Sequence, residues 1–143
     1  MYFQKINPTK SSWWFGTMTL MNNENVSIIV VRQPLLVQAL IPLAQKWHGN
    51  LVKGVADVDQ GILALGGDWH MDANNVLIAD GSQQKHVWGF NIYPDERGDA
   101  AIEYISLINI RPAQGNRDME IQDTDLRTTV RTLVSRLIPE LFV

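Results

Sequence analysis

The segment 86-HVWGFNIYPDERGDAAIEYISLINIRP-112 decides the fold that we predict for this chain. Both halves are rich in β-branched and aromatic residues, and the turn "DERGD" joins them, so we expect an antiparallel hairpin. The register that places Asn91 opposite Glu103 also places Trp88 opposite Ser106. In this register Trp88, Phe90 and Tyr104 share one face, which is predicted to be core.

Working outward from this hairpin, the spacing of apolar residues predicts the order β-α-ββ-α-ββ-α. The elements are a strand at 26–32, a helix that begins near Ile41 beside Pro42, a hairpin of strands 51–58 and 62–67, a helix that begins at Asp72 and ends at Gly81, the hairpin above, and a helix at 124–138. We therefore expect a single α+β domain at 26–143. Its architecture is predicted as a two-layer sandwich, a mainly antiparallel sheet of four to five strands with the helices on one face.

Residues 1–25 lack a clear period, and we treat them as an N-terminal appendage to the domain. Two interpretations stay open: a peripheral hairpin held by Trp13 and Trp14, or a disordered tail. The aromatic run Trp13, Trp14 and Phe15 is also a candidate partner surface, through which the chain would form a homo-oligomer.

The composition excludes several classes of function. The chain has 143 residues, 45% of them hydrophobic and 19% charged, a net charge of −3 and no cysteine. The absence of cysteine excludes disulfides, thiolate zinc sites and a cysteine nucleophile, and it fits a cytoplasmic protein. Lys and Arg are scattered, so nucleic acid is not an expected partner, and no apolar run has the roughly 20 residues of a membrane span.

A polar cluster follows the last predicted strand. Its members, joined by Asn91 from the neighbouring strand, are Asn109, Arg111, Gln114, Asn116 and Arg117. Guanidinium forks and amides around a glycine suit a carboxylate, a phosphate or another small polar or anionic ligand. The alternative is a structural clamp, in which the same side chains satisfy the backbone of a long loop in a non-catalytic interaction or regulatory domain.

Catalysis would require a second group of residues. His70 is the candidate general acid or base, oriented by Asp72 or Glu103, and hydrolysis is the first reaction class to test. The alternative for His70 is a structural role, in which it caps the following helix or bonds a backbone carbonyl. Metal ligation by His70 and Asp72 lacks a recognisable spacing, so no metal site is predicted, and the sequence leaves any cofactor unknown. Ser82 and Ser106 lack the sequence context of a nucleophile.

Four motifs taken together resemble a known family: "GGDWHMDA", "DGSQQ", "WGFNIYP" and "INIRPAQGNR". On these motifs the chain, from about residue 26 to 138, is similar to the bacterial domain of unknown function 5674. This resemblance implies a small cytoplasmic domain without an assigned activity. It provides no catalytic residues, so the candidate residues above stand on their own chemistry.

Overall fold

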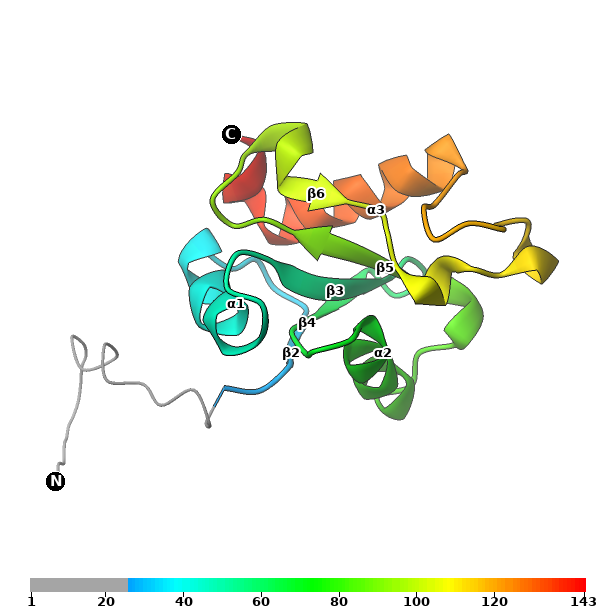
Figure 1. Cartoon of the computed structure of the whole chain (residues 1–143), viewed down its shortest axis with the longest axis horizontal. Coiled ribbons are helices and arrows are strands. Elements are labelled where there is room, and N and C mark those ends of the chain that lie inside the picture. Colours follow the sequence, from blue (N-terminus) through cyan, green and yellow to red (C-terminus); the bar gives the residue numbers. More distant parts are fainter. Residues whose placement is uncertain (1–25) are drawn as a thin grey trace, which may run out of the picture.

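Five antiparallel strands form the sheet of the computed structural model, which describes residues 26–143 (Figure 1). The strands are β2 (Ile29–Val31), β3 (Val52–Asp57), β4 (Ile62–Leu65), β5 (Val87–Ile92) and β6 (Ile102–Glu103). Their order across the sheet is β2-β4-β3-β5-β6. The α+β class, the antiparallel sheet and the number of strands are thus as the sequence predicts.

Three α-helices and several short 3-10 turns connect these strands. The helices are α1 (Ile41–Trp47), α2 (His70–Ala79) and α3 (Thr124–Leu137). The 3-10 turns are η3 (Val37–Leu40), η4 (Gln84–His86), η5 (Gly98–Ala101), η6 (Leu107–Asn109), η7 (Pro112–Gln114) and η8 (Pro139–Phe142). Pro42 occupies the first turn of α1, where its missing N–H has no helical partner to lose, so the helix begins at Ile41 as predicted.

The helices lie on both faces of the sheet, which differs from the expected two-layer arrangement. On one face, α1 and α3 pack against alternate strand residues such as Leu63 and Phe90. On the other face, Ala73 and Leu77 of α2 pack against Val55 and Ala64. Figure 1 shows α2 on the side of the sheet opposite to α3. The reason is that the central strands are buried on both faces, so a second helical layer is needed.

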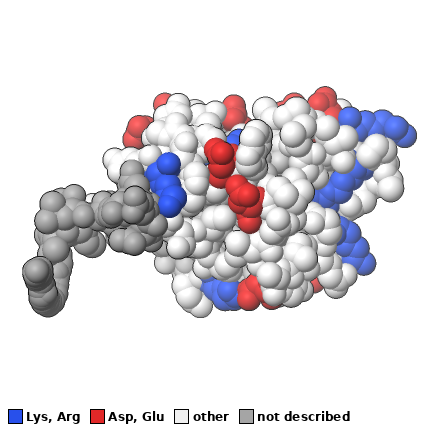
Figure 2. All heavy atoms as spheres, turned by 60° about the horizontal axis from the view of Figure 1, so that its bottom comes forward, with Lys and Arg blue, Asp and Glu red and all other residues white. Residues whose placement is uncertain are grey.

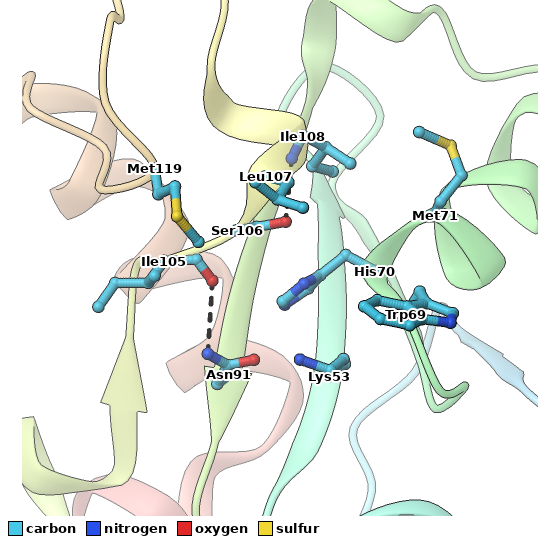
Figure 3. A pocket seen from close by; sticks show the side chains of 10 residues that line it. All are labelled: Lys53, Trp69, His70, Met71, Asn91, Ile105, Ser106, Leu107, Ile108 and Met119. Atoms are coloured by element: carbon cyan, nitrogen blue, oxygen red, sulfur yellow. Dashed lines mark hydrogen bonds between the residues drawn. The ribbon is translucent and has the colours of Figure 1, made fainter.

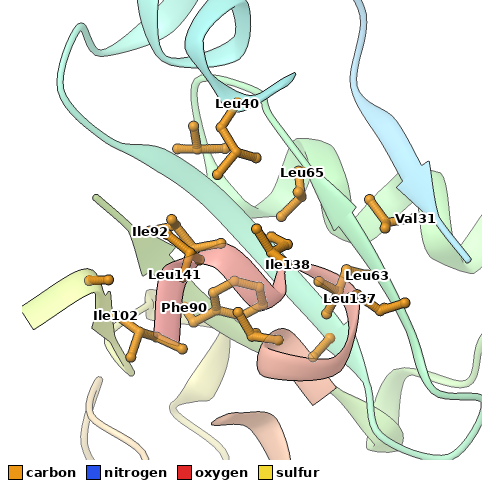
Figure 4. Packing of buried hydrophobic residues seen from close by; sticks show 14 of the residues in the cluster. Val31, Leu40, Leu63, Leu65, Phe90, Ile92, Ile102, Leu137, Ile138 and Leu141 are labelled. Carbon is orange, nitrogen blue, oxygen red and sulfur yellow. The ribbon is translucent and has the colours of Figure 1, made fainter. Parts of the chain in front are cut away.

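The larger core lies between the sheet and α3. Its fully buried side chains come from the sheet, from η3 and from the C-terminal end of the chain (Figure 4). They include Leu40, Leu65, Phe90, Ile92, Leu137, Ile138 and Leu141. The amphipathic pattern of 124–138 therefore buries its apolar stripe as predicted.

The predicted hairpin has the expected register but a much shorter second strand. Asn91 pairs with Glu103 and Ile92 with Ile102. The ladder then ends. The predicted pairing of Trp88 with Ser106 is wrong, because Ser106 is the N-cap of η6 and the chain leaves the sheet there. The expectations for residues 1–25, including the partner surface of Trp13, Trp14 and Phe15, lie outside the described residues.

Candidate ligand-binding site

A cavity of about 440 Å³ opens between α2, the sheet and the segment that follows β6 (Figure 3). This volume lies in the range of small-molecule pockets in proteins. The residues that line it are Lys53, Trp69, His70, Met71, Asn91, Ile105, Ser106, Leu107, Ile108 and Met119. We call this cavity the α2 pocket.

The wall opposite α2 exists because the chain leaves the sheet after Glu103. Ser106 caps η6 by accepting a hydrogen bond from the Ile108 N–H, which turns the chain across β5. Gly89 permits the close approach, since a Cβ at this position would lie 2.5 Å from the Ser106 Cβ. The segment 105–109 therefore covers β5 without being paired to it as a strand.

Asn109 replaces the strand pairing that is lost. Its side-chain oxygen accepts from the Gly89 N–H at 2.8 Å, and its amide nitrogen donates to the Gly89 carbonyl at 3.0 Å and to the Met119 carbonyl at 3.1 Å. The residue is fully buried. One amide side chain thus satisfies both backbone groups of Gly89, as a neighbouring strand would.

The floor of the pocket carries its polar groups. Lys53 on β3 stands directly opposite Asn91 on β5. The amide nitrogen of Asn91 donates to Glu103 Oε1 at 3.3 Å and to the Ile105 carbonyl at 3.4 Å, while its buried oxygen has no donor within the described chain. Figure 3 shows this oxygen turned away from Ile105, toward the side of Lys53 and His70.

His70, the first residue of α2, is buried at the edge of this floor. Its Nε2 lies 2.9 Å from the Phe90 carbonyl oxygen, which can only accept, so Nε2 carries the proton. Burial and the nearby charge of Lys53 lower the pKa of His70 to about 4. The imidazole is therefore neutral at pH 7, and Lys53 carries the one formal charge among the lining side chains.

The rim of the pocket is unusually apolar for a surface. Trp69 and Leu107 are each 64% exposed, and the side chains of Met71, Ile105 and Met119 are also exposed. These five residues all line the α2 pocket. Exposed apolar side chains gathered around one cavity indicate a surface that is covered when a partner or ligand is bound.

Most members of the predicted polar cluster bond to backbone groups instead of lining the pocket. Arg111 stacks on Trp88 and donates to the carbonyls of Ile108, Gln84 and Val87. Asn116 donates to three carbonyls of its own loop and accepts from the Gln122 N–H. Gln114 donates to the Lys85 carbonyl. These contacts are those expected of the structural clamp.

Arg117 differs from the rest of the cluster. Its side chain is exposed and has no hydrogen-bond or ion-pair partner among residues 26–143. Of the six predicted ligand-binding residues, Asn91 alone lines the pocket.

The two carboxylates expected to orient His70 bond elsewhere. Asp72 Oδ2 accepts from the N–H groups of Asp68 and Trp69, so this side chain holds the start of α2. Glu103 accepts from the Tyr93 hydroxyl at 2.8 Å and from Asn91. In the described residues neither carboxylate is hydrogen-bonded to His70.

Sequence reasoning did not single out Lys53, Met71, Leu107 or Met119. Lys53 becomes a pocket residue because β3 pairs with β5, two strands that are not consecutive in the chain. A lysine between Val52 and Val55 was the available signal, since a charged side chain in a central strand requires a polar or solvent-facing setting.

Three further observations describe residues 26–143 as a whole. These residues contain no group of three His, Asp or Glu side chains that could hold a metal ion. None of their helices is long and apolar enough to cross a membrane. On the face shown in Figure 2, Lys and Arg lie mainly along the margins of a largely uncharged surface.

The comparisons with known proteins give one match. A family model described as "Protein of unknown function (DUF5674)" matches residues 29–137. No curated protein and no solved structure matches the chain.

Proposed function

The chain belongs to the DUF5674 family, whose description assigns no activity, and we propose its function from the α2 pocket. The geometry of this pocket supports the binding of a small amphipathic molecule. The apolar part of this molecule fills the cavity between α2 and the segment 105–109, and its polar end meets the floor formed by Lys53 and Asn91. One observation carries the proposal: five of the exposed large apolar side chains surround a single cavity.

The energetics favour an apolar ligand over a purely polar one. Burial of apolar surface contributes roughly 25 cal/mol per Å², whereas a polar molecule would exchange its hydrogen bonds with water for very few in this cavity. Met71 and Met119 have flexible thioether side chains that adapt to ligands of different shape. The walls therefore support binding of a hydrocarbon body.

Binding is better supported than hydrolysis. In the described part of the chain, His70 has no hydroxyl or carboxylate partner, because its Nε2 bonds to the Phe90 carbonyl. The Ser106 hydroxyl accepts from the Ile108 N–H and serves as a cap. A nucleophile paired with a base, which hydrolysis by a serine would need, is not assembled from these two residues.

The test uses the fluorescent probe 8-anilinonaphthalene-1-sulfonate, which combines an apolar body with an anionic group. We expect saturable binding of one probe molecule and a loss of affinity of about tenfold in Leu107→Gln, because one wall of the pocket becomes polar. Leu36→Gln is the matched control, since Leu36 is 61% exposed and lies outside the pocket. Equal affinity in the two variants would contradict the proposal.

A further inference from the structure

We propose that the ligand of the α2 pocket is a free monocarboxylic acid, held by its carboxylate at Lys53 with its apolar chain between α2 and the segment 105–109. This inference rests on the proposed function and names the chemical class of the ligand. It is carried by the charge of Lys53 and by the apolar side chains that surround this lysine in the pocket.

Lys53 is the cationic group that the pocket offers. Its side chain is half-buried and has no hydrogen-bond or ion-pair partner among residues 26–143. The two carboxylates that the sequence predicts for this site are engaged elsewhere, because Asp72 holds the start of α2 and Glu103 bonds to Tyr93 and Asn91. A half-buried ammonium without a counter-ion favours an anionic ligand.

The buried side-chain oxygen of Asn91 needs a donor, which a carboxylate lacks and the ammonium of Lys53 can provide. The residue is 8% exposed, and among residues 26–143 its side-chain oxygen has no hydrogen-bond donor of normal geometry; its proximity to the His70 ring offsets only part of the lowering of the His70 pKa. The acceptors Glu103 Oε1 and Ile105 O fix the orientation of the amide, because exchange of its nitrogen and oxygen would place oxygen against oxygen. The oxygen therefore faces the side of Lys53, its partner in register.

The ammonium of Lys53 has three N–H donors, which are enough to bond to both the Asn91 side chain and the carboxylate of the ligand. One N–H can donate to Asn91 Oδ1 while the others donate to the carboxylate of the ligand. In this arrangement Asn91 is a positioning residue that directs Lys53 toward the carboxylate.

The single charge also limits the class of anion. Neutral His70 adds no positive charge to the floor. The N-terminal end of α2 adds little, because the carboxylate of Asp72 already accepts from the amides of Asp68 and Trp69. One cation and apolar walls match a monoanion with a hydrocarbon chain better than a phosphate, which carries more charge and needs more donors.

The experiment compares three octyl ligands by calorimetry: octanoate, octan-1-ol and octylammonium. These share an apolar chain and differ in the charge of the head group. We expect octanoate to bind the full chain about tenfold more tightly than octanol, with octylammonium weakest. Hexanoate should bind roughly tenfold more weakly than octanoate, because two methylene groups are removed from the apolar walls.

Variants then test the role of Lys53. Lys53→Met should reduce the affinity for octanoate about tenfold and leave that for octanol unchanged or higher, whereas Lys53→Arg should keep the preference for octanoate. Lys85→Met is the matched control, because Lys85 is exposed and lies outside the pocket, so the net charge changes equally. Melting temperatures without ligand show whether each variant is folded.

The outcomes separate the two proposals. Absence of binding for all three octyl ligands would overturn both the proposed function and this inference. Equal affinity for octanoate, octanol and octylammonium, or equal effects of Lys53→Met and Lys85→Met, would overturn the inference and leave the apolar pocket standing. Tighter binding of a heptapeptide that ends in leucine than of octanoate would replace the free acid with the C-terminus of a polypeptide.

Discussion

Asn109 forms the contact between the sheet and the segment that closes the pocket. Its amide bonds to both backbone groups of Gly89 and to the Met119 carbonyl, all inside the protein. A side chain with one donor group and one acceptor group is required here, so neither Asp nor Leu is equivalent.

We predict that Asn109→Ala lowers the free energy of unfolding by about 2 to 4 kcal/mol, because the N–H and carbonyl of Gly89 lose their side-chain partner and the Met119 carbonyl keeps only the Ser106 N–H. Urea denaturation measures this loss. Arg117→Ala is the control from the same polar cluster and should change the free energy by less than about 0.5 kcal/mol, since its side chain is exposed. Similar losses in both variants would contradict the distinction between the two residues.

His70 makes stability depend on pH. Its pKa is about 4 in the folded protein against an ordinary value of 6.5, so between these values the unfolded chain binds more protons. The free energy of unfolding must therefore fall as the pH is lowered from 6.5 toward 4. We predict a loss of about 2 to 3 kcal/mol from this residue between pH 7.5 and pH 4.5.

The control for this prediction is His70→Gln, which keeps an amide donor near the Phe90 carbonyl without titrating. Its free energy of unfolding should change less over the same range. Asp57 does not interfere. Burial would raise the pKa of Asp57, but hydrogen bonds from Ser82, Gln60 and Asp59 lower it below 3.8. The contribution of Asp57 to the free energy of unfolding is therefore lost only below about pH 3.8, outside that pH range. Identical pH profiles for the two proteins would show that His70 is not buried in neutral form.

At the scale of elements, the segment 105–109 is fixed against β5 by shape as well as by hydrogen bonds. Gly89 leaves room for the Ser106 side chain, and Ile108 packs with the residues beneath α2. The distance between α2 and this segment, and hence the width of the pocket, therefore depends on a glycine in the middle of a strand.

We predict that Gly89→Ala lowers the free energy of unfolding by about 1 to 3 kcal/mol, because the new methyl group would overlap Ser106. The double variant Gly89→Ala with Ser106→Gly removes the overlapping side chain and should recover part of this loss. A double-mutant cycle measured by urea denaturation gives the coupling. Additive effects of the two substitutions would mean that these residues are not in contact.

Much of the fold could be predicted from the sequence, because each element has a strong local pattern. The turn at Asp59–Gly61 predicts the β3–β4 hairpin, and the apolar stripe of 124–138 predicts α3. The two-sided burial of the sheet was not predicted, because short apolar runs such as "ILAL" do not show which faces are covered.

At the scale of the whole molecule, the site depends on contacts between segments distant in sequence. Lys53 meets Asn91 through the pairing of β3 with β5, and Met119 reaches the same pocket from the loop before α3. A sequence pattern does not contain this information. Sequence reasoning identified His70 and Asn91 because a histidine and an amide stand out among apolar neighbours. Arg111 and Asn116 stood out equally, yet they bond to backbone carbonyls, so residue type alone did not separate pocket residues from structural ones.

The most direct test of the account is the NMR spectrum of the full chain labelled with ¹³C in its methionine methyl groups, titrated with octanoate. Met71 and Met119 lie in walls contributed by different segments, and Met71→Leu and Met119→Leu assign their signals. We predict that both signals shift saturably, with one common dissociation constant, because one ligand fills the cavity between the two side chains. Unchanged signals of Met71 and Met119 at octanoate concentrations that saturate any other site would contradict it.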